Sequence, residues 1–134
     1  MERLIQLFRA LSEEARLRIV MLLTNGELCV CDLMAILEEP QSKISRHLAY
    51  LTHSGLTKGK RVGVWMHYSL KEPLDKVYKA EIEFLKKQLS HFPQLSSDKN
   101  RLLELKKRGN CKAVLKVNHY RLEGGSFVLS SITN

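Results

Sequence analysis

Two cysteines separated by a single residue, Cys29 and Cys31, are the side chains in this sequence best suited to bind an ion. Their thiolates are soft ligands, which favour arsenite, antimonite, cadmium, lead, zinc or copper(I) over harder ions. The same residues could instead be small members of a hydrophobic core, because free cysteine is often buried. The spacing alone leaves both interpretations open.

The backbone around these cysteines decides whether one ion can reach both. They lie at the start of residues 29–38, where apolar side chains recur at helical spacing. On an α-helix, positions i and i+2 are about 200° apart, so one ion could bind both only if the first turn opened. In extended backbone the two side chains would lie on one side. We therefore expect ion binding and helix formation to compete here, which would couple the ion to the position of the next helix.

The elements that position the cysteines are predicted to form a mainly α fold with a small β-hairpin. Helical spacing covers residues 2–11, a segment from the N-cap Ser12 to a stop at Asn25-Gly26, and residues 29–38, 40–54 and 73–91. After Gly55 the spacing changes towards two, which predicts strands over residues 56–58 and 64–70 and a basic turn over 59–63. Two helices joined by a short turn and followed by a hairpin indicate a winged helix-turn-helix.

The 134 residues have the usual length of one domain. We assign residues 1–91 to the winged helix-turn-helix and residues 92–134 to a C-terminal extension. In the extension, residues 92–98 are predicted to be a linker because they are rich in serine and contain a proline. Residues 99–108 are predicted to be a short basic helix. For residues 113–134 a hairpin and a disordered tail both remain open.

A candidate DNA-binding surface follows the cysteines along the chain. Residues 41–71 contain no Asp or Glu but several Lys and Arg, as a surface lying against phosphates requires. With Ile44, Leu48 and Leu51 turned inward, the opposite face of the 40–54 helix would read base edges, glutamine pairing with adenine and arginine with guanine. For His47, nearer the core edge, simple packing is an open alternative. The residues predicted to contact DNA are Gln41, Ser42, Lys43, Ser45, Arg46, His47 and Tyr50 on the helix and Lys60 and Arg61 in the hairpin turn.

Charge and composition narrow the function class. The formal net charge of +8 fits a polyanionic partner, although basic proteins can also simply be soluble. The three cysteines are an odd number and make a poor disulfide framework. The sequence shows no signal peptide and no apolar stretch of membrane-spanning length, so we expect a cytoplasmic protein with reduced thiols and no membrane partner. Because no nucleophile set, phosphate loop or paired acids stand out, we expect no enzymatic activity.

Three motifs together resemble one known family. Glu-Leu-Cys-Val-Cys-Asp-Leu at residues 27–33, Ser-Arg-His-Leu at 45–48 and Gly-Val-Trp-Met-His-Tyr at 63–68 closely resemble the ArsR/SmtB family of metal-responsive repressors. The resemblance covers roughly residues 1–91. It implies a homodimer joined through the first and last helices of that domain, an operator near the protein's own promoter, and release from DNA when metal binds. The stripes expected at the dimer interface are Leu4, Leu7, Phe8 and Leu11, and Leu74, Tyr78, Leu85 and Leu89.

The resemblance also bears on the ion. Arsenite-responsive members often carry a third cysteine three residues after the pair, where this sequence has Met34, for which we expect a core role. Cys111 or an external thiol is then the candidate third ligand. Zinc-responsive members use paired acids and histidines on the long dimer helix, where this sequence offers only His91. Cadmium- or lead-responsive members add cysteines before the first helix, where this sequence has none. The resemblance thus favours arsenite or antimonite as inducer, with a cadmium-, lead- or thiol-redox-responsive repressor of the same fold as the alternative.

Overall fold

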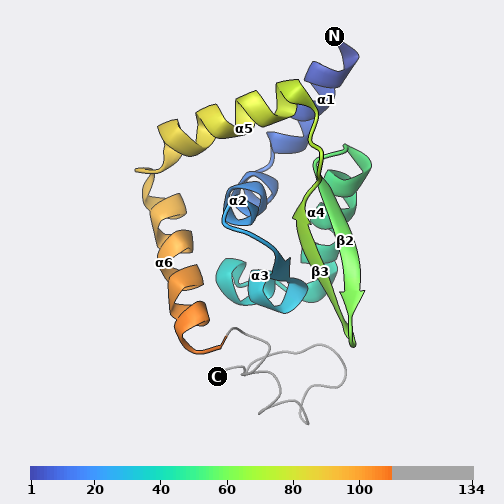
Figure 1. The fold of residues 1–134 in the computed structure, drawn as a ribbon. Helices are drawn as coiled ribbons and strands as arrows, with labels where there is room; N and C mark the ends of the chain where they lie inside the picture. The colour runs from blue at the N-terminus through green and yellow to red at the C-terminus, as the bar shows by residue number, and fades with distance from the viewer. Residues whose placement is uncertain (110–134) are drawn as a thin grey trace.

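The computed structural model describes residues 1–109 of the chain. Their fold is mainly α with a small sheet, as the sequence predicts (Figure 1). Cys111 and the hairpin or tail predicted over 113–134 lie outside the described residues. No helix in residues 1–109 is both long and apolar enough to cross a membrane. The elements are α1 (Glu2–Leu11), α2 (Glu14–Leu23), β1 (Leu28–Cys29), α3 (Val30–Leu37), α4 (Gln41–His53), β2 (Thr57–Val62), β3 (Trp65–Leu70), α5 (Lys76–Leu89) and α6 (Pro93–Lys107).

The core is formed by apolar side chains that recur at helical spacing on α1 to α4. The stripe predicted for α4 is confirmed, because Ile44, Leu48 and Leu51 are completely buried. Each buried leucine or isoleucine side chain contributes about 1.5–3 kcal/mol. This stripe therefore fixes which face of α4 points away from the protein. Fully buried partners from the preceding helices include Leu7, Ile19, Val20, Leu33 and Ile36.

The corner between α1 and α2 differs from the prediction. Ser12 does not cap α2, because its hydroxyl donates to the Arg9 carbonyl oxygen at 2.8 Å and so ends α1. The N-cap of α2 is Glu13, which makes no side-chain capping bond. Arg16 of α2 instead caps the C-terminus of α1, donating from Nε to the Ala10 carbonyl oxygen at 2.7 Å and from Nη2 to that of Arg9 at 3.1 Å.

The sheet has one strand more than predicted, in the order β1-β3-β2, and both pairings are antiparallel. The two-residue strand β1 pairs Cys29 with His67. The wing hairpin is longer than predicted, and its two-residue turn has Gly63 at a φ of +65°, a conformation that favours glycine. The predicted basic turn over 59–63 is therefore wrong, because Lys60 and Arg61 lie on β2 within the ladder, opposite His67 and Met66.

The linker predicted over residues 92–98 is also wrong, because α6 begins at Pro93. Proline is tolerated at the first helical position, where its missing N–H has no helical partner. The basic helix predicted over 99–108 is the second half of α6. This helix packs against α2 and α3, and it buries Leu102 and Leu105 in the common core (Figure 1).

The apolar stripes predicted for a dimer interface are used in part by the chain itself. Leu7 is fully buried, and Tyr78 is buried with its hydroxyl donating to the Ser54 carbonyl oxygen at 3.0 Å. These two side chains are therefore not available to a partner. Phe8 remains about half exposed, as do three large apolar residues of α1 and α5 outside the predicted stripes. Those three are Ile5 on α1 and Val77 and Phe84 on α5.

Candidate functional site

Cys29 is the N-cap of α3 and not a residue of its first turn. Its backbone is extended, with φ −76° and ψ 151°, because it also ends β1. Its Sγ accepts the N–H of Cys31 at 3.3 Å, while the Asp32 carboxylate accepts the N–H of Cys29 at 3.0 Å. The two bonds form a reciprocal capping box in which a thiol takes the place usually held by a hydroxyl.

This geometry corrects the predicted start of the helix, which begins at Val30 and not at Cys29. The pKa of Cys29 is lowered, chiefly by a side-chain hydrogen bond with Cys31 and further by the Cys31 N–H, although burial opposes the shift. Cys29 is thus extended while α3 is fully formed, and its Sγ lies against the first turn of that helix, 3.3 Å from the Cys31 backbone nitrogen. Both side chains are almost completely buried, at 2% and 0% exposure.

Cys29 and Cys31 are the sulfur ligands that the described residues offer. Met34 is half-buried and packs against the core, as the sequence predicts. Within residues 1–109 no group of three His, Cys, Asp or Glu side chains is placed to hold a metal. Cys111, the third ligand predicted from the sequence, lies outside this part of the chain.

A polar cluster that the sequence did not reveal joins the cysteine strand to the wing. The Glu27 carboxylate accepts from His67 Nδ1 at 2.9 Å, and Lys60 Nζ lies 3.4 Å from its other oxygen. Burial raises the pKa of Glu27, but Lys60 and His67 outweigh it and leave that pKa below its usual value. The Nε2 atom of His67 is buried and has no hydrogen-bond partner among the residues described. The cluster could have been predicted only from the pairing of β1 with β3. That pairing depends on tertiary contacts, which the sequence pattern does not show.

The exposed face of α4 carries the residues predicted to read DNA. Gln41, Ser42, Lys43, Ser45, Arg46, Ala49 and Tyr50 are all exposed. His47 is half-buried, and burial lowers its pKa, so its imidazole is mainly neutral at pH 7. The structure thus brings the predicted helix residues onto one surface, with His47 at its edge.

Charged side chains from outside residues 41–71 reach this surface. Lys43 Nζ lies 3.3 Å from the Glu39 carboxylate, and Lys60 pairs with Glu27. Residues 41–71 contain no acidic residue, but the fold brings these two carboxylates next to their lysines. The guanidinium of Arg16, from α2, lies over the Tyr50 ring at 4.0 Å from its centre. Arg16 therefore adds a cation to this face that sequence reasoning missed.

Comparisons with known proteins agree with this geometry. Residues 13–58 match the family described as "Bacterial regulatory protein, arsR family". The chain is 57% identical over 67 residues to the arsenical resistance operon repressor of Escherichia coli K12, a match that covers 49% of this chain and 57% of that relative. The match thus spans little more than half of the relative's length.

Solved structures give the same picture of the fold. HlyU from Vibrio cholerae N16961 is similar with a TM-score of 0.59 and 33% identity, over 65% of this chain and 91% of that chain. The homodimeric winged helix-turn-helix DNA-binding domain of Mb0332 from Mycobacterium bovis has a TM-score of 0.55 at 22% identity, over 69% and 86% of the two chains. The predicted winged helix-turn-helix architecture is confirmed by these likenesses.

Proposed function

Because this chain belongs to the ArsR family of bacterial regulatory proteins, we propose that it is a transcriptional repressor released from operator DNA by arsenite or antimonite. The inducer would bind Cys29 and Cys31. The observation that carries this proposal is the pair of buried cysteines at the N-terminus of α3, where Cys29 Sγ accepts the Cys31 N–H, on the helix that leads into α4. The name of the Escherichia coli relative, an arsenical resistance repressor, supports the same ion class.

DNA binding is supported by the way α4 is held. Its buried stripe leaves Gln41 and Arg46 exposed on the opposite face, where amide and guanidinium groups can pair with adenine and guanine. Lys60 and Arg61 lie on the exposed strand β2 of the wing. In this proposal Lys60 exchanges Glu27 for a DNA phosphate, which costs little because exposed ion pairs are weak.

The proposed release follows from the chemistry of the cap. Each thiol that bonds to arsenic displaces one hydroxyl of arsenous acid, and the thiol proton leaves with that hydroxyl as water. Cys29 Sγ then belongs to a bridge with Cys31, in place of its present role as acceptor for the Cys31 N–H. The N-terminus of α3 has to shift to accommodate the bridge. A three-residue turn, Glu38 to Pro40, connects that helix to α4.

A second copy of the chain is the proposed partner. Two DNA-reading helices related by a two-fold axis can meet half-sites one turn of DNA apart. The half-exposed apolar side chains of α1 and α5 lie on helices that contact each other, and a two-fold interface would bury them against the same side chains of the second copy. The side chains proposed for this interface are Ile5, Phe8, Val77 and Phe84.

The test is a titration of the protein–DNA complex under reducing conditions with arsenite, antimonite, cadmium, lead and zinc in parallel. We expect arsenite and antimonite to release the DNA. The matched control is the double variant Cys29→Ser/Cys31→Ser, which should bind DNA and stay bound when arsenite is added. Release of this variant by arsenite would contradict the proposal. Release of the wild type by cadmium or lead alone, or by peroxide alone in a parallel titration without reductant, would assign it to the alternative sensor class.

A further inference from the structure

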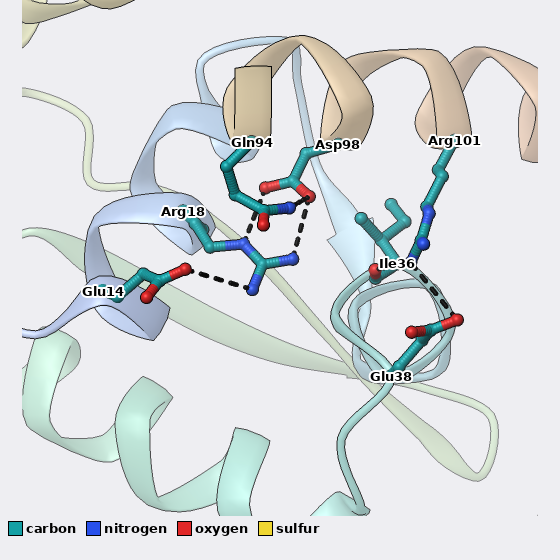
Figure 2. A network of polar contacts seen from close by, with 7 residues as sticks. All are labelled: Glu14, Arg18, Ile36, Glu38, Gln94, Asp98 and Arg101. Atoms are coloured by element: carbon teal, nitrogen blue, oxygen red, sulfur yellow. Dashed lines mark hydrogen bonds and ion pairs between the residues drawn. The ribbon is translucent and has the colours of Figure 1, made fainter. Parts of the chain in front are cut away.

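Helix α6 is tied to α2 by a buried ion pair (Figure 2). The Asp98 carboxylate is almost completely buried and accepts two hydrogen bonds from Arg18 of α2, from Nε and Nη2, both at 2.9 Å. Gln94 donates a third bond to Asp98 at 3.1 Å. A bidentate pair of this kind fixes orientation as well as distance. It therefore holds α6 at one position along α2.

A second contact leads from α6 to the far end of α3. Arg101 Nη1 donates to the Ile36 carbonyl oxygen at 2.8 Å and lies 3.4 Å from the Glu38 carboxylate (Figure 2). Carbonyls in the last turn of a helix have no helical partner, and a cation is favourable at that end. Arg101 thus caps α3 from a different helix.

The residue that Arg101 pairs with is under backbone strain. Glu38 has a φ of +57°, in the left-handed region that costs a residue with a side chain roughly 1–2 kcal/mol. This residue ends α3, and α4 begins three residues later. The direction of α4 relative to α3 therefore depends on a backbone conformation that is unfavourable for glutamate without other contacts.

We propose that α6 is a brace for the DNA-reading helix and that Arg101 is the positioning residue that holds the turn between α3 and α4. The inference rests on the proposed function in that α4 reads DNA. Arg101 is 43% exposed, and an exposed ion pair adds little stability. The ion pair of Asp98 and the buried Leu102 and Leu105 dock α6 without it. The contact of Arg101 therefore matters mainly for the geometry of the turn.

The test compares Arg101→Ala with the matched control Lys99→Ala, which removes an exposed cation from the same helix. The probe is a DNA duplex selected by the wild-type chain from a random-sequence pool. We expect Arg101→Ala to weaken binding about tenfold, within the range of mutations that act through a coupled element, and Lys99→Ala to leave it nearly unchanged. Arg101→Lys, which can still donate to Ile36, should recover part of the loss.

Two further measurements separate positioning from other roles. If Arg101 contacted phosphate directly, the slope of log affinity against log salt would fall by about one, whereas a positioning role leaves that slope unchanged. Amide exchange in the free protein should quicken at Glu39 and Lys43, next to the turn, in Arg101→Ala but not in Lys99→Ala. Equal affinity and equal exchange in the two variants would overturn the brace. Failure of the wild type to select any DNA would instead reject the proposed function, while the exchange measurement would still test the brace.

Discussion

Replacing the two cysteines one at a time should separate the capping role from the ion-binding role. Cys29 is the N-cap of α3 and uses its sulfur as the acceptor for the Cys31 N–H. Serine is among the preferred N-cap residues and offers a stronger acceptor at nearly the same place. We therefore expect Cys29→Ser to keep the free energy of unfolding or to raise it, by up to about 1 kcal/mol.

Cys31→Ser should behave differently, because this side chain is completely buried in the core. In the unfolded chain the serine hydroxyl makes hydrogen bonds to water, whereas in the folded protein its neighbour is the sulfur of Cys29, a weak acceptor. Losing the hydrogen bonds to water costs about 1–3 kcal/mol. The two single variants should thus differ in stability by roughly 1–4 kcal/mol, the sum of the two effects. Both lose one of the two thiols, so both should lose release by arsenite while keeping DNA binding.

Urea unfolding followed by circular dichroism at pH 7 with a reductant measures the difference in stability. The anisotropy of labelled DNA with added arsenite measures the loss of release. Cys31→Ala is the control, since it removes the thiol but keeps the core apolar. If Cys29→Ser is destabilised as much as Cys31→Ser, the capping geometry is wrong. If either serine variant still releases DNA at the wild-type arsenite concentration, the assigned site is wrong.

Three further predictions test the surfaces around this site. Arg46→Ala should weaken binding to the selected DNA by about 1–3 kcal/mol, whereas Lys60→Ala should weaken all sequences alike and lower the salt slope by about one, both measured by anisotropy. Phe84→Glu should give a folded monomer in sedimentation, and a persistent dimer would exclude this face of α5. Asp75, the N-cap of α5, pairs with Arg3 of α1, and its pKa is lowered, first by the hydrogen bond from Arg3. Its stabilising effect is therefore complete above its unfolded pKa and is lost as pH falls through the lower folded value. Urea midpoints of Asp75→Asn should therefore fall less steeply below about pH 4 than those of the wild type.

Sequence patterns predicted the elements whose position depends on burial. The stripe on α4 was predictable because Ile44, Leu48 and Leu51 can all be buried only if that segment is helical. The strand β1 was not predictable, because two residues have no period and the strand exists through its pairing with β3. The cluster of Glu27, Lys60 and His67 depends on that pairing and was missed with it.

Small errors in element boundaries changed the chemistry that was inferred. A helix starting at Cys29 would place both cysteines in its first turn, whereas the observed start at Val30 leaves Cys29 extended, with its Sγ accepting the Cys31 N–H. The start of α6 was missed because serine and proline in residues 93–97 suggested a linker. Leu95, Leu102 and Leu105 recur at helical spacing, and this signal was available in the sequence.

Helix α3 has the two cysteines at its N-terminus and the turn to α4 at its C-terminus, so it can transmit a movement from one to the other. Its eight residues span about 12 Å, and a rigid helix of that length cannot absorb a shift of its first turn internally. Displacement at Cys31 must therefore appear either in β1 or at the turn that Arg101 holds. The pairing with β3 restrains β1, and Arg101 of α6 restrains the turn. The direction of the shift depends on which of these two restraints is weaker. Arg101→Ala weakens the second restraint, so more of the shift appears at the turn between α3 and α4. A turn without this contact can bend, and it then absorbs the shift before the shift moves α4. We expect the ratio of DNA affinities without and with arsenite to be smaller in this variant than in the wild type, and an unchanged ratio would show that the shift passes through the sheet.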